Sequence, residues 1–184
     1  REGNMVASTP SGGWIGTSPV IKGLGFCLGT RGQMFYLNPQ RPNALAPHKR
    51  PRATLTPTLV TKDGEPFMVF GTPGGDAQEQ WTSQFFLNYV DFGMNIQEAL
   101  DAPTVHSLHH PSSFYPRPAY PARVVAESRI SEGVVDELRK RGHKVQLTDG
   151  WSNGKVMAIR IDKERGVIQG GVSPKGNIGY AFGW

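Results

Sequence analysis

The chain has 184 residues, with 20 Lys and Arg against 15 Asp and Glu, and a formal net charge of +5. This length is enough for one domain with its own core, and we predict a single domain over residues 1–184. Hydrophobic residues make up 38% and charged residues 19%, a balance that excludes a disordered chain. No apolar run approaches the ~20 residues of a membrane-spanning helix. The single cysteine, Cys27, excludes an internal disulfide framework and a zinc site of paired cysteines.

The positive charge is spread along the chain, with two denser stretches at 41–52 and 139–144. The first is rich in proline and is predicted to be a solvated loop. The second ends a predicted helix, where cations complement the helix dipole. A nucleic-acid binder would need basic residues interleaved with aromatic side chains that stack on bases. We therefore expect no nucleic-acid partner.

Strands dominate the predicted elements of the first half of the chain. They cover residues 5–9, 26–28, 56–60 and 66–70. The hairpin partner of the first is expected upstream of Arg1. The dipeptide Asp63-Gly64 lies between the last two, and Asp-Gly between β-rich runs is a strong signal for a hairpin.

Two helices are predicted next. The first follows Gly74-Gly75 and has Trp81, Phe85, Tyr89 and Val90 at three- and four-residue spacing, which indicates one apolar face. The second covers residues 96–102. Asn95 is its expected N-terminal cap, and Pro103 stops it.

The last third is predicted to contain one helix and several strands. The helix begins after Ser131, buries Val134, Val135 and Leu138, and ends at Gly142. Residues 106–121 are predicted as loop, and strands are predicted at 123–127, 145–147, 156–161, 167–168 and 180–182. Strands on both sides of the helices predict an α+β fold with a largely antiparallel sheet.

The Gly74-Gly75 pair is the most informative candidate for chemistry. It lies between a strand and a helix, where successive N–H groups and the helix N-terminus can point at one anionic atom. That is the geometry of an oxyanion hole in acyl transfer. A tight turn that requires positive φ explains the same two glycines, and the local pattern leaves both interpretations open.

Other candidate groups carry weaker signals. The chain has no G-x-S-x-G sequence of the α/β-hydrolase type. Cys27 lies between two apolar residues and is expected to be a small buried side chain. His106, His109 and His110 have metal-like spacing, but their proline-flanked segment favours structural or solvated histidines. We expect no metal and no cofactor.

Several motifs in a fixed order carry a family resemblance. They are Lys49-Arg50-Pro51, Thr56-Pro57-Thr58, Lys62-Asp63-Gly64, Pro73-Gly74-Gly75, residues 91–99, Asp101-Ala102-Pro103 and Arg141-Gly142-His143. In this order and spacing they resemble the small, C-terminal subunit of the γ-glutamyltransferase (γ-glutamyltranspeptidase) family, which belongs to the N-terminal nucleophile hydrolases. The resemblance covers essentially the whole chain.

The resemblance implies an αββα sandwich, of which this chain is the small-subunit part without its first strand. It also implies a precursor that cleaves itself and exposes an N-terminal threonine, which serves as nucleophile and, through its α-amine, as base. Such an enzyme cleaves amides such as the γ-glutamyl bond of glutathione and passes the acyl group to water or an amine. The implied partners are the large subunit of the same precursor and a small acyl amide. The threonine is expected about eight residues upstream of Arg1, so the chain alone is expected to be inactive.

The resemblance also assigns roles to residues near the nucleophile. Gly74 and Gly75 match the oxyanion-hole glycines of the family. A Thr-x-Asn element that positions the nucleophile falls on Ser11 and Gly13. Ser11 keeps a supporting hydroxyl, whereas Gly13, assigned to the substrate site, keeps no side chain.

The substrate pocket departs from the family pattern. The Ser-Ser pair that holds the substrate carboxylate falls on Ala53 and Thr54, so one hydroxyl remains. Acids that bind the glutamyl α-amine are expected within residues 29–35, which contain no Asp or Glu but do contain Arg31. An acyl group that ends in a bare carboxylate, such as the glutaryl group of cephalosporin-acylase relatives, suits Arg31 better. Alternatively, Arg31 pairs with an acid elsewhere in the protein.

Two further expectations concern the whole chain. As an alternative to an enzyme, the protein is a non-catalytic relative of the family that binds a ligand. Because the sheets of the family are shared between subunits, the chain alone is expected to expose apolar faces and to self-associate, with residues 10–25 poorly ordered. The sequence does not indicate the compartment.

Overall fold

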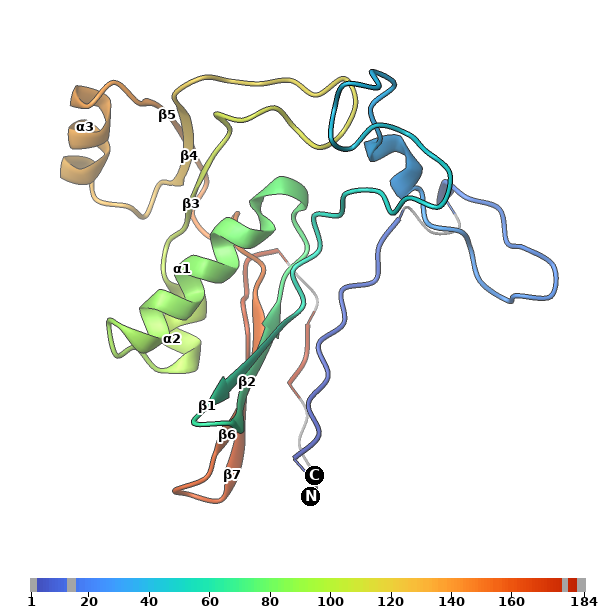
Figure 1. The fold of residues 1–184 in the computed structure, drawn as a ribbon. Coiled ribbons are helices and arrows are strands. Elements are labelled where there is room, and N and C mark those ends of the chain that lie inside the picture. Colours follow the sequence, from blue (N-terminus) through green and yellow to red (C-terminus); the bar gives the residue numbers. More distant parts are fainter. Residues whose placement is uncertain (1–2, 13–15, 177–178, 182–184) are drawn as a thin grey trace.

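A computed structural model describes residues 3–12, 16–176 and 179–181 of the chain. Its larger sheet consists of β1 (Thr58–Lys62), β2 (Glu65–Gly71), β6 (Met157–Asp162) and β7 (Val167–Val172). The strands are antiparallel in the order β1-β2-β6-β7 (Figure 1). The chain therefore returns after about 85 residues to place β6 beside β2.

The β1–β2 hairpin confirms the prediction from Asp63-Gly64. Asp63 has φ 54° and Gly64 has φ 81°, as a tight hairpin turn requires of both central residues. The register places Lys62 opposite Glu65 across this turn. An irregularity between Val60 and Thr61 bends the first strand.

Two helices cover one face of the larger sheet. The short turn η3 (Gly75–Ala77) leads into α1 (Gln78–Val90), and α2 (Ile96–Asp101) follows. The core between sheet and helices contains Met68, Phe70, Trp81, Phe85, Ile96, Leu100, Val156 and Ala158. The predicted cap of α2 is confirmed: the Asn95 side chain accepts a bond from the Glu98 N–H at 3.0 Å, and the Glu98 carboxylate accepts one from the Asn95 N–H at 2.9 Å.

A smaller sheet packs beside this layer in the order β3 (Val105–Ser107), β4 (Arg123–Glu127), β5 (Lys144–Thr148). The β3–β4 pair is antiparallel and the β4–β5 pair is parallel, with α3 (Glu132–Lys140) connecting the latter two. One more short helix, η2 (Arg31–Met34), lies in the long N-terminal loop region. None of the helices in the described ranges is long and apolar enough to cross a membrane.

Three of the predicted strands are wrong in part or whole. Residues 5–9 form no strand, because they run along one face of the larger sheet and pair with none of its strands in the described ranges. Residues 26–28 contain only an isolated bridge between Val20 and Cys27, and Phe26 and Leu28 are exposed. Tyr180 lies in no strand, and Phe182 lies outside the described residues.

Three other predictions, all in the region around the smaller sheet, are wrong. His106 belongs to β3 rather than to a loop, because residues 105–107 pair with β4. Val134 is 51% exposed, whereas Val135 is buried, so the buried stripe of α3 is narrower than predicted. The Ser131 side chain makes no capping bond, although α3 begins where predicted.

A buried ionic cluster joins the two sheets. Glu127 of β4 and Lys175, which follows β7, are both fully buried and lie 3.4 Å apart. Arg129 pairs with Glu127 at 2.5 Å, and its guanidinium also donates to the Asp101 carbonyl at the end of α2. The cluster therefore fixes the smaller sheet against α2 and the chain after β7.

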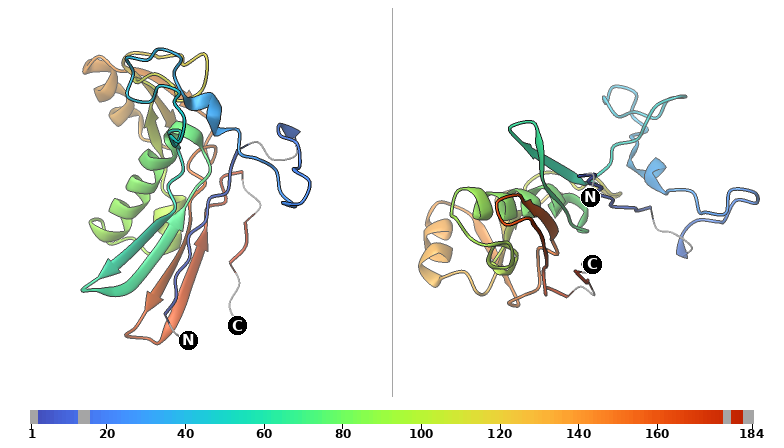
Figure 2. Two further views of the ribbon diagram at one scale, coloured as in Figure 1. Left: turned by 45° about the vertical axis from the view of Figure 1, so that its right-hand side comes forward. Right: turned by 90° about the horizontal axis from the view of Figure 1, so that it is seen from below.

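The face of the larger sheet opposite the helices carries apolar side chains. We call it the open face. Its members alternate with the residues that face the helices, and they include Leu59, Val69, Met157, Ile159 and Ile168. The N-terminal segment 3–12 runs along this face (Figure 2), yet Ile159 remains 49% and Ile168 72% exposed.

Candidate active site

A cleft of about 2070 Å³ lies between the N-terminal segment, the open face and the turn that follows β2. Of the predicted site residues, the cleft brings together Ser11, Arg31, Thr54, Gly74 and Gly75. Ala53 is exposed and is not part of the lining. Gly13 lies outside the described residues.

Both glycines of the turn after β2 have backbone angles that disfavour other residues. Gly74 has φ 145° and Gly75 has φ 57°. A Cβ atom at Gly74 would lie 2.3 Å from Cζ3 of Trp81, so the turn also needs glycine for space. The Gly74 carbonyl accepts a bond from the Ala77 N–H at 3.1 Å. The Gly74 N–H has no acceptor in the described part of the chain.

Gln78, at the start of α1, ties the turn to its surroundings. The side chain is 3% exposed. With the amide oriented as its neighbours require, its nitrogen donates to the carbonyls of Thr72 at 2.9 Å and Thr54 at 3.1 Å. Its oxygen accepts a bond from the Gly75 N–H at 3.2 Å.

Arg31 places an uncompensated guanidinium in the cleft. Its Nη2 donates to the Ser11 hydroxyl at 2.5 Å, and its Cζ lies 5.7 Å from the centre of the Phe114 ring. Its Nε is buried and has no hydrogen-bond acceptor in the described part of the chain. Within the described ranges, no carboxylate pairs with Arg31. The guanidinium therefore has N–H donors available for an anion.

The loop of Phe114 is held against the glycine turn by Asp76. The Asp76 carboxylate accepts bonds from the Ser113 N–H at 2.8 Å and from the Ser112 hydroxyl at 3.1 Å. These bonds place Phe114 so that its Cε2 lies 3.3 Å from the position of a Cβ at Gly75. The Phe114 ring is therefore close to both the glycine turn and Arg31.

Thr54 adds a polar group to the same wall. Thr54 is only 5% exposed, and its hydroxyl has no hydrogen-bond partner among the residues that the structure describes. An unpaired buried hydroxyl is uncommon in a folded protein and is frequent where a ligand supplies the missing bond.

The histidines of residues 106–110 make different contacts. His106 packs edge-on against Trp81 with ring centres 5.2 Å apart, and burial lowers the pKa of its imidazole. His109 accepts a bond from the Ala122 N–H at 3.0 Å. Across the described ranges, no group of three or more His, Cys, Asp or Glu lies close enough to hold a metal ion.

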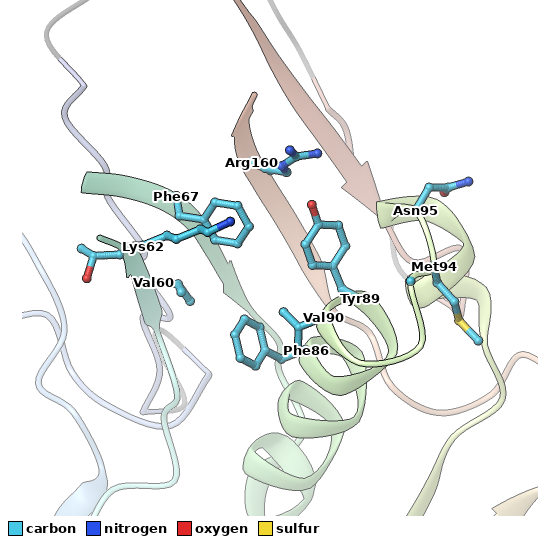
Figure 3. Close-up of a pocket in the computed structure, with 11 residues that line it drawn as sticks. Val60, Lys62, Phe67, Phe86, Tyr89, Val90, Met94, Asn95 and Arg160 are labelled. Carbon is cyan, nitrogen blue, oxygen red and sulfur yellow. The ribbon is translucent and has the colours of Figure 1, made fainter. Parts of the chain in front are cut away.

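A second, smaller hollow of about 610 Å³ lies where α1 meets the β1–β2 hairpin (Figure 3). Phe67, Tyr89 and Arg160 line it, together with Lys62 on β1. The charge of Arg160 is already compensated by Asp162 at 3.6 Å, and Arg160 lies close to the rings of Phe67 and Tyr89. The hollow contains neither the glycine turn nor the predicted site residues, so the larger cleft is the candidate active site.

Three residues of this site were not predicted from the sequence. Asp76 follows the glycine pair directly and Gln78 lies two residues further on, so a search for polar residues in the first turn of the helix would have found both. Phe114 lies in a loop that only tertiary packing brings to Gly75, and no local pattern identifies it.

The class of this protein follows from its fold and from solved structures. The chain matches the structure of LmbA2991HD with 46% identity and a TM-score of 0.86, covering 96% of this chain and 31% of that chain. It matches the cephalosporin acylase of Bacillus halodurans with 34% identity and a TM-score of 0.70, covering 82% of this chain and 26% of that chain. The fold is thus the small-subunit part of an N-terminal nucleophile hydrolase, as the sequence predicted.

The family is equally clear. The model of the gamma-glutamyltranspeptidase family matches residues 1–182, so the chain belongs to this family. A similar relative is the glutathione hydrolase-like YwrD proenzyme of Bacillus subtilis, 31% identical over 171 residues, which are 92% of this chain and 31% of that protein. The chain spans about a third of the length of the curated relatives it matches.

Proposed function

We propose that the chain is the small-subunit part of an amide-cleaving acyltransferase or hydrolase of the γ-glutamyltranspeptidase family. The observation that carries this proposal is the glycine turn at the cleft, which presents Gly74 with an N–H that has no acceptor in the described part of the chain. Family membership supports the reaction class, and relatives such as YwrD are named as glutathione hydrolase-like proenzymes.

The proposed reaction uses a threonine exposed by self-cleavage of a longer precursor. Its hydroxyl attacks the amide carbonyl and gives its proton to the α-amine of the same residue. The Gly74 N–H is the proposed donor to the resulting oxyanion, since the Gly75 N–H already donates to Gln78, and Ser11 supports the nucleophile. The C–N bond then breaks, the amine leaves with the proton, and water or an acceptor amine releases the acyl group from the threonine ester.

The proposed partner is the large subunit of the same precursor. The open face supports this assignment, because its apolar residues Ile159 and Ile168 are 49% and 72% exposed in the chain by itself. A second β-layer over this face would complete an αββα sandwich and close one side of the cleft.

Expression of the full-length precursor tests the proposal. Intact mass and N-terminal sequencing should show a small subunit that begins with threonine upstream of Arg1, and the processed protein should hydrolyse γ-glutamyl-p-nitroanilide. A precursor that stays uncleaved and inactive would instead identify a non-catalytic relative and would contradict the proposal.

A second candidate substrate is favoured by Arg31. An acyl group with a bare carboxylate, such as glutaryl, would pair with the uncompensated guanidinium and with the unpaired hydroxyl of Thr54. The α-ammonium group of a γ-glutamyl substrate would instead face like charge. The B. halodurans relative, a cephalosporin acylase, is consistent with this alternative.

Arg31→Gln in the processed enzyme separates the two substrates. We expect kcat/KM for glutaryl-p-nitroanilide to fall about 10- to 100-fold, with a much smaller change for γ-glutamyl-p-nitroanilide. Arg41→Gln is the matched control, because Arg41 also lies over an aromatic ring, Tyr36, but does not line the cleft. Equal losses of kcat/KM on both substrates would show that Arg31 does not determine substrate choice.

A further inference from the structure

We infer that Gln78 is the positioning residue of the proposed oxyanion site. This inference rests on the proposed function, since it concerns the same glycine turn. It assigns to the side-chain amide of Gln78 the task of holding the Gly74–Gly75 peptide and the segment of Thr54 in one fixed arrangement.

The geometry gives Gln78 three backbone partners from three separate segments. These are the carbonyl of Thr72 after β2, the carbonyl of Thr54 in the preceding loop and the N–H of Gly75 in the turn. Two carbonyl oxygens face one end of the amide and one N–H faces the other, which fixes the orientation of the amide. With 3% exposure, little water reaches the side chain to replace these bonds.

The bonds fix the peptide between the two glycines at both ends. Its N–H, from Gly75, donates to Gln78, and its carbonyl, from Gly74, accepts from Ala77. Because glycine has no side chain, the peptides of this turn can rotate at small steric cost. The turn therefore depends on bonds from neighbouring residues to keep its arrangement. The free N–H of Gly74 belongs to the preceding peptide, and its direction therefore depends on the arrangement that Gln78 maintains.

Glutamine is suited to this task because one amide both donates twice and accepts once. A glutamate of the same shape accepts from Gly75, but as a carboxylate it has no proton for the carbonyls of Thr54 and Thr72. Its protonated form regains one donor. Methionine has a similar length and volume but makes none of the three bonds.

Gln78→Met and Gln78→Glu in the processed full-length enzyme test the inference. We expect kcat of Gln78→Met to fall about 10- to 100-fold with a smaller change in KM, which is less than the loss that follows removal of an oxyanion donor itself. Gln78→Glu should be more active at lower pH, where its carboxyl is protonated, and should add a step to the pH profile that the wild type lacks.

Gln84→Glu is the matched control. Gln84 is another glutamine of α1 whose amide bonds to backbone, accepting from the Val105 N–H at 3.0 Å and donating to the Val105 carbonyl at 2.7 Å. It lies outside the cleft lining, so this variant should keep the wild-type kcat and pH profile. Wild-type kcat and pH profile in folded Gln78→Glu, or an equal change in Gln84→Glu, would overturn the inference.

Amide hydrogen exchange measured on ¹⁵N-glycine-labelled processed enzyme gives a readout that needs no activity. The Gly75 N–H should be protected in the wild type and should exchange faster in Gln78→Met, while Gly71 in β2 keeps its protection. If the wild type hydrolyses no amide, the proposed function fails and exchange alone decides the role of Gln78. Rapid exchange of Gly75 in the wild type would then refute it.

Discussion

At the scale of single residues, the cleft combines backbone that favours glycine with polar side chains that lack partners among the described residues. Gly74 occupies a left-handed backbone region directly against Trp81. Arg31 and Thr54 each keep a buried polar atom that bonds to none of the described residues. Such groups reduce stability unless a ligand completes them, which is why they concentrate at functional sites.

Gly74→Ala should destabilise the fold by about 2 kcal/mol or more, because the new Cβ meets both unfavourable φ and the indole of Trp81. Urea unfolding of the processed protein measures this. Gly133→Ala is the control: Gly133 lies in α3 with no atom within 4 Å of its Cβ position, so alanine there should raise stability by about 0.5–1 kcal/mol. A neutral Gly74→Ala would show that the turn can relax.

At the scale of elements, local signals define the pieces that frame the site. Strand β2 of the hairpin leads into the glycine turn, and α1 starts shortly after this turn. The short helix α2 depends on its cap more than the longer α1 does, because a six-residue helix has few internal hydrogen bonds.

Asn95→Ala should lower the free energy of unfolding by about 1 kcal/mol, since it removes the side-chain acceptor of the Glu98 N–H. Asn95→Asp should retain most of the stability, because the carboxylate accepts the same bond and favours the helix N-terminus. Thermal unfolding of both variants beside the wild type checks this. Equal losses in the two variants would show that the amide acts through another contact.

At the scale of the whole molecule, a buried carboxylate holds the two sheets together. Burial raises the pKa of Glu127, but hydrogen bonds from Arg129 and the charge of Lys175 outweigh it and leave the pKa below its ordinary value. A folded pKa below the unfolded one means that the carboxylate stabilises the fold above its unfolded pKa of about 4.3. This stabilisation is lost as the pH falls through the folded pKa.

Unfolding measured between pH 3 and pH 7 should therefore show a loss of stability on the acid side, and Glu127→Gln should flatten that slope. At pH 7 this variant should be about 3 kcal/mol less stable, because it leaves the buried Lys175 and the partly buried Arg129 without the charge of Glu127. Glu137→Gln, which removes only an exposed pair with Arg141, should change stability by less than about 0.5 kcal/mol. An unchanged acid slope in Glu127→Gln would assign the pH dependence to other groups.

The open face should make the chain self-associate when it is produced alone. Ile168→Ser is expected to shift the sedimentation profile toward monomer, because it removes a largely exposed side chain from the face. Leu37→Ser is the control, since Leu37 is 88% exposed but belongs to a distant loop. Coexpression with the preceding part of the precursor should abolish association in the wild type. A monomeric wild-type chain would contradict the expected role of this face.

Local chemistry determined much of this protein from its sequence alone. The Asp63-Gly64 turn, the Asn95 cap and the helix after Gly74-Gly75 each depend on residues within a few positions of one another, and all were predicted. The family resemblance was also carried by short ordered motifs. These features are readable because turns and caps have strong residue preferences.

Tertiary structure alone decided how the cleft is assembled. Phe114 reaches Gly75 because Asp76 binds a distant loop, and Gln78 joins three segments that no periodicity connects. Residues 5–9 have the pattern of a strand, yet they lie over a face of the larger sheet rather than beside an edge strand. Strand pairing and side-chain bonds between distant segments depend on which surfaces meet in the folded chain. No local sequence pattern specifies these meetings, because they result from the fold as a whole.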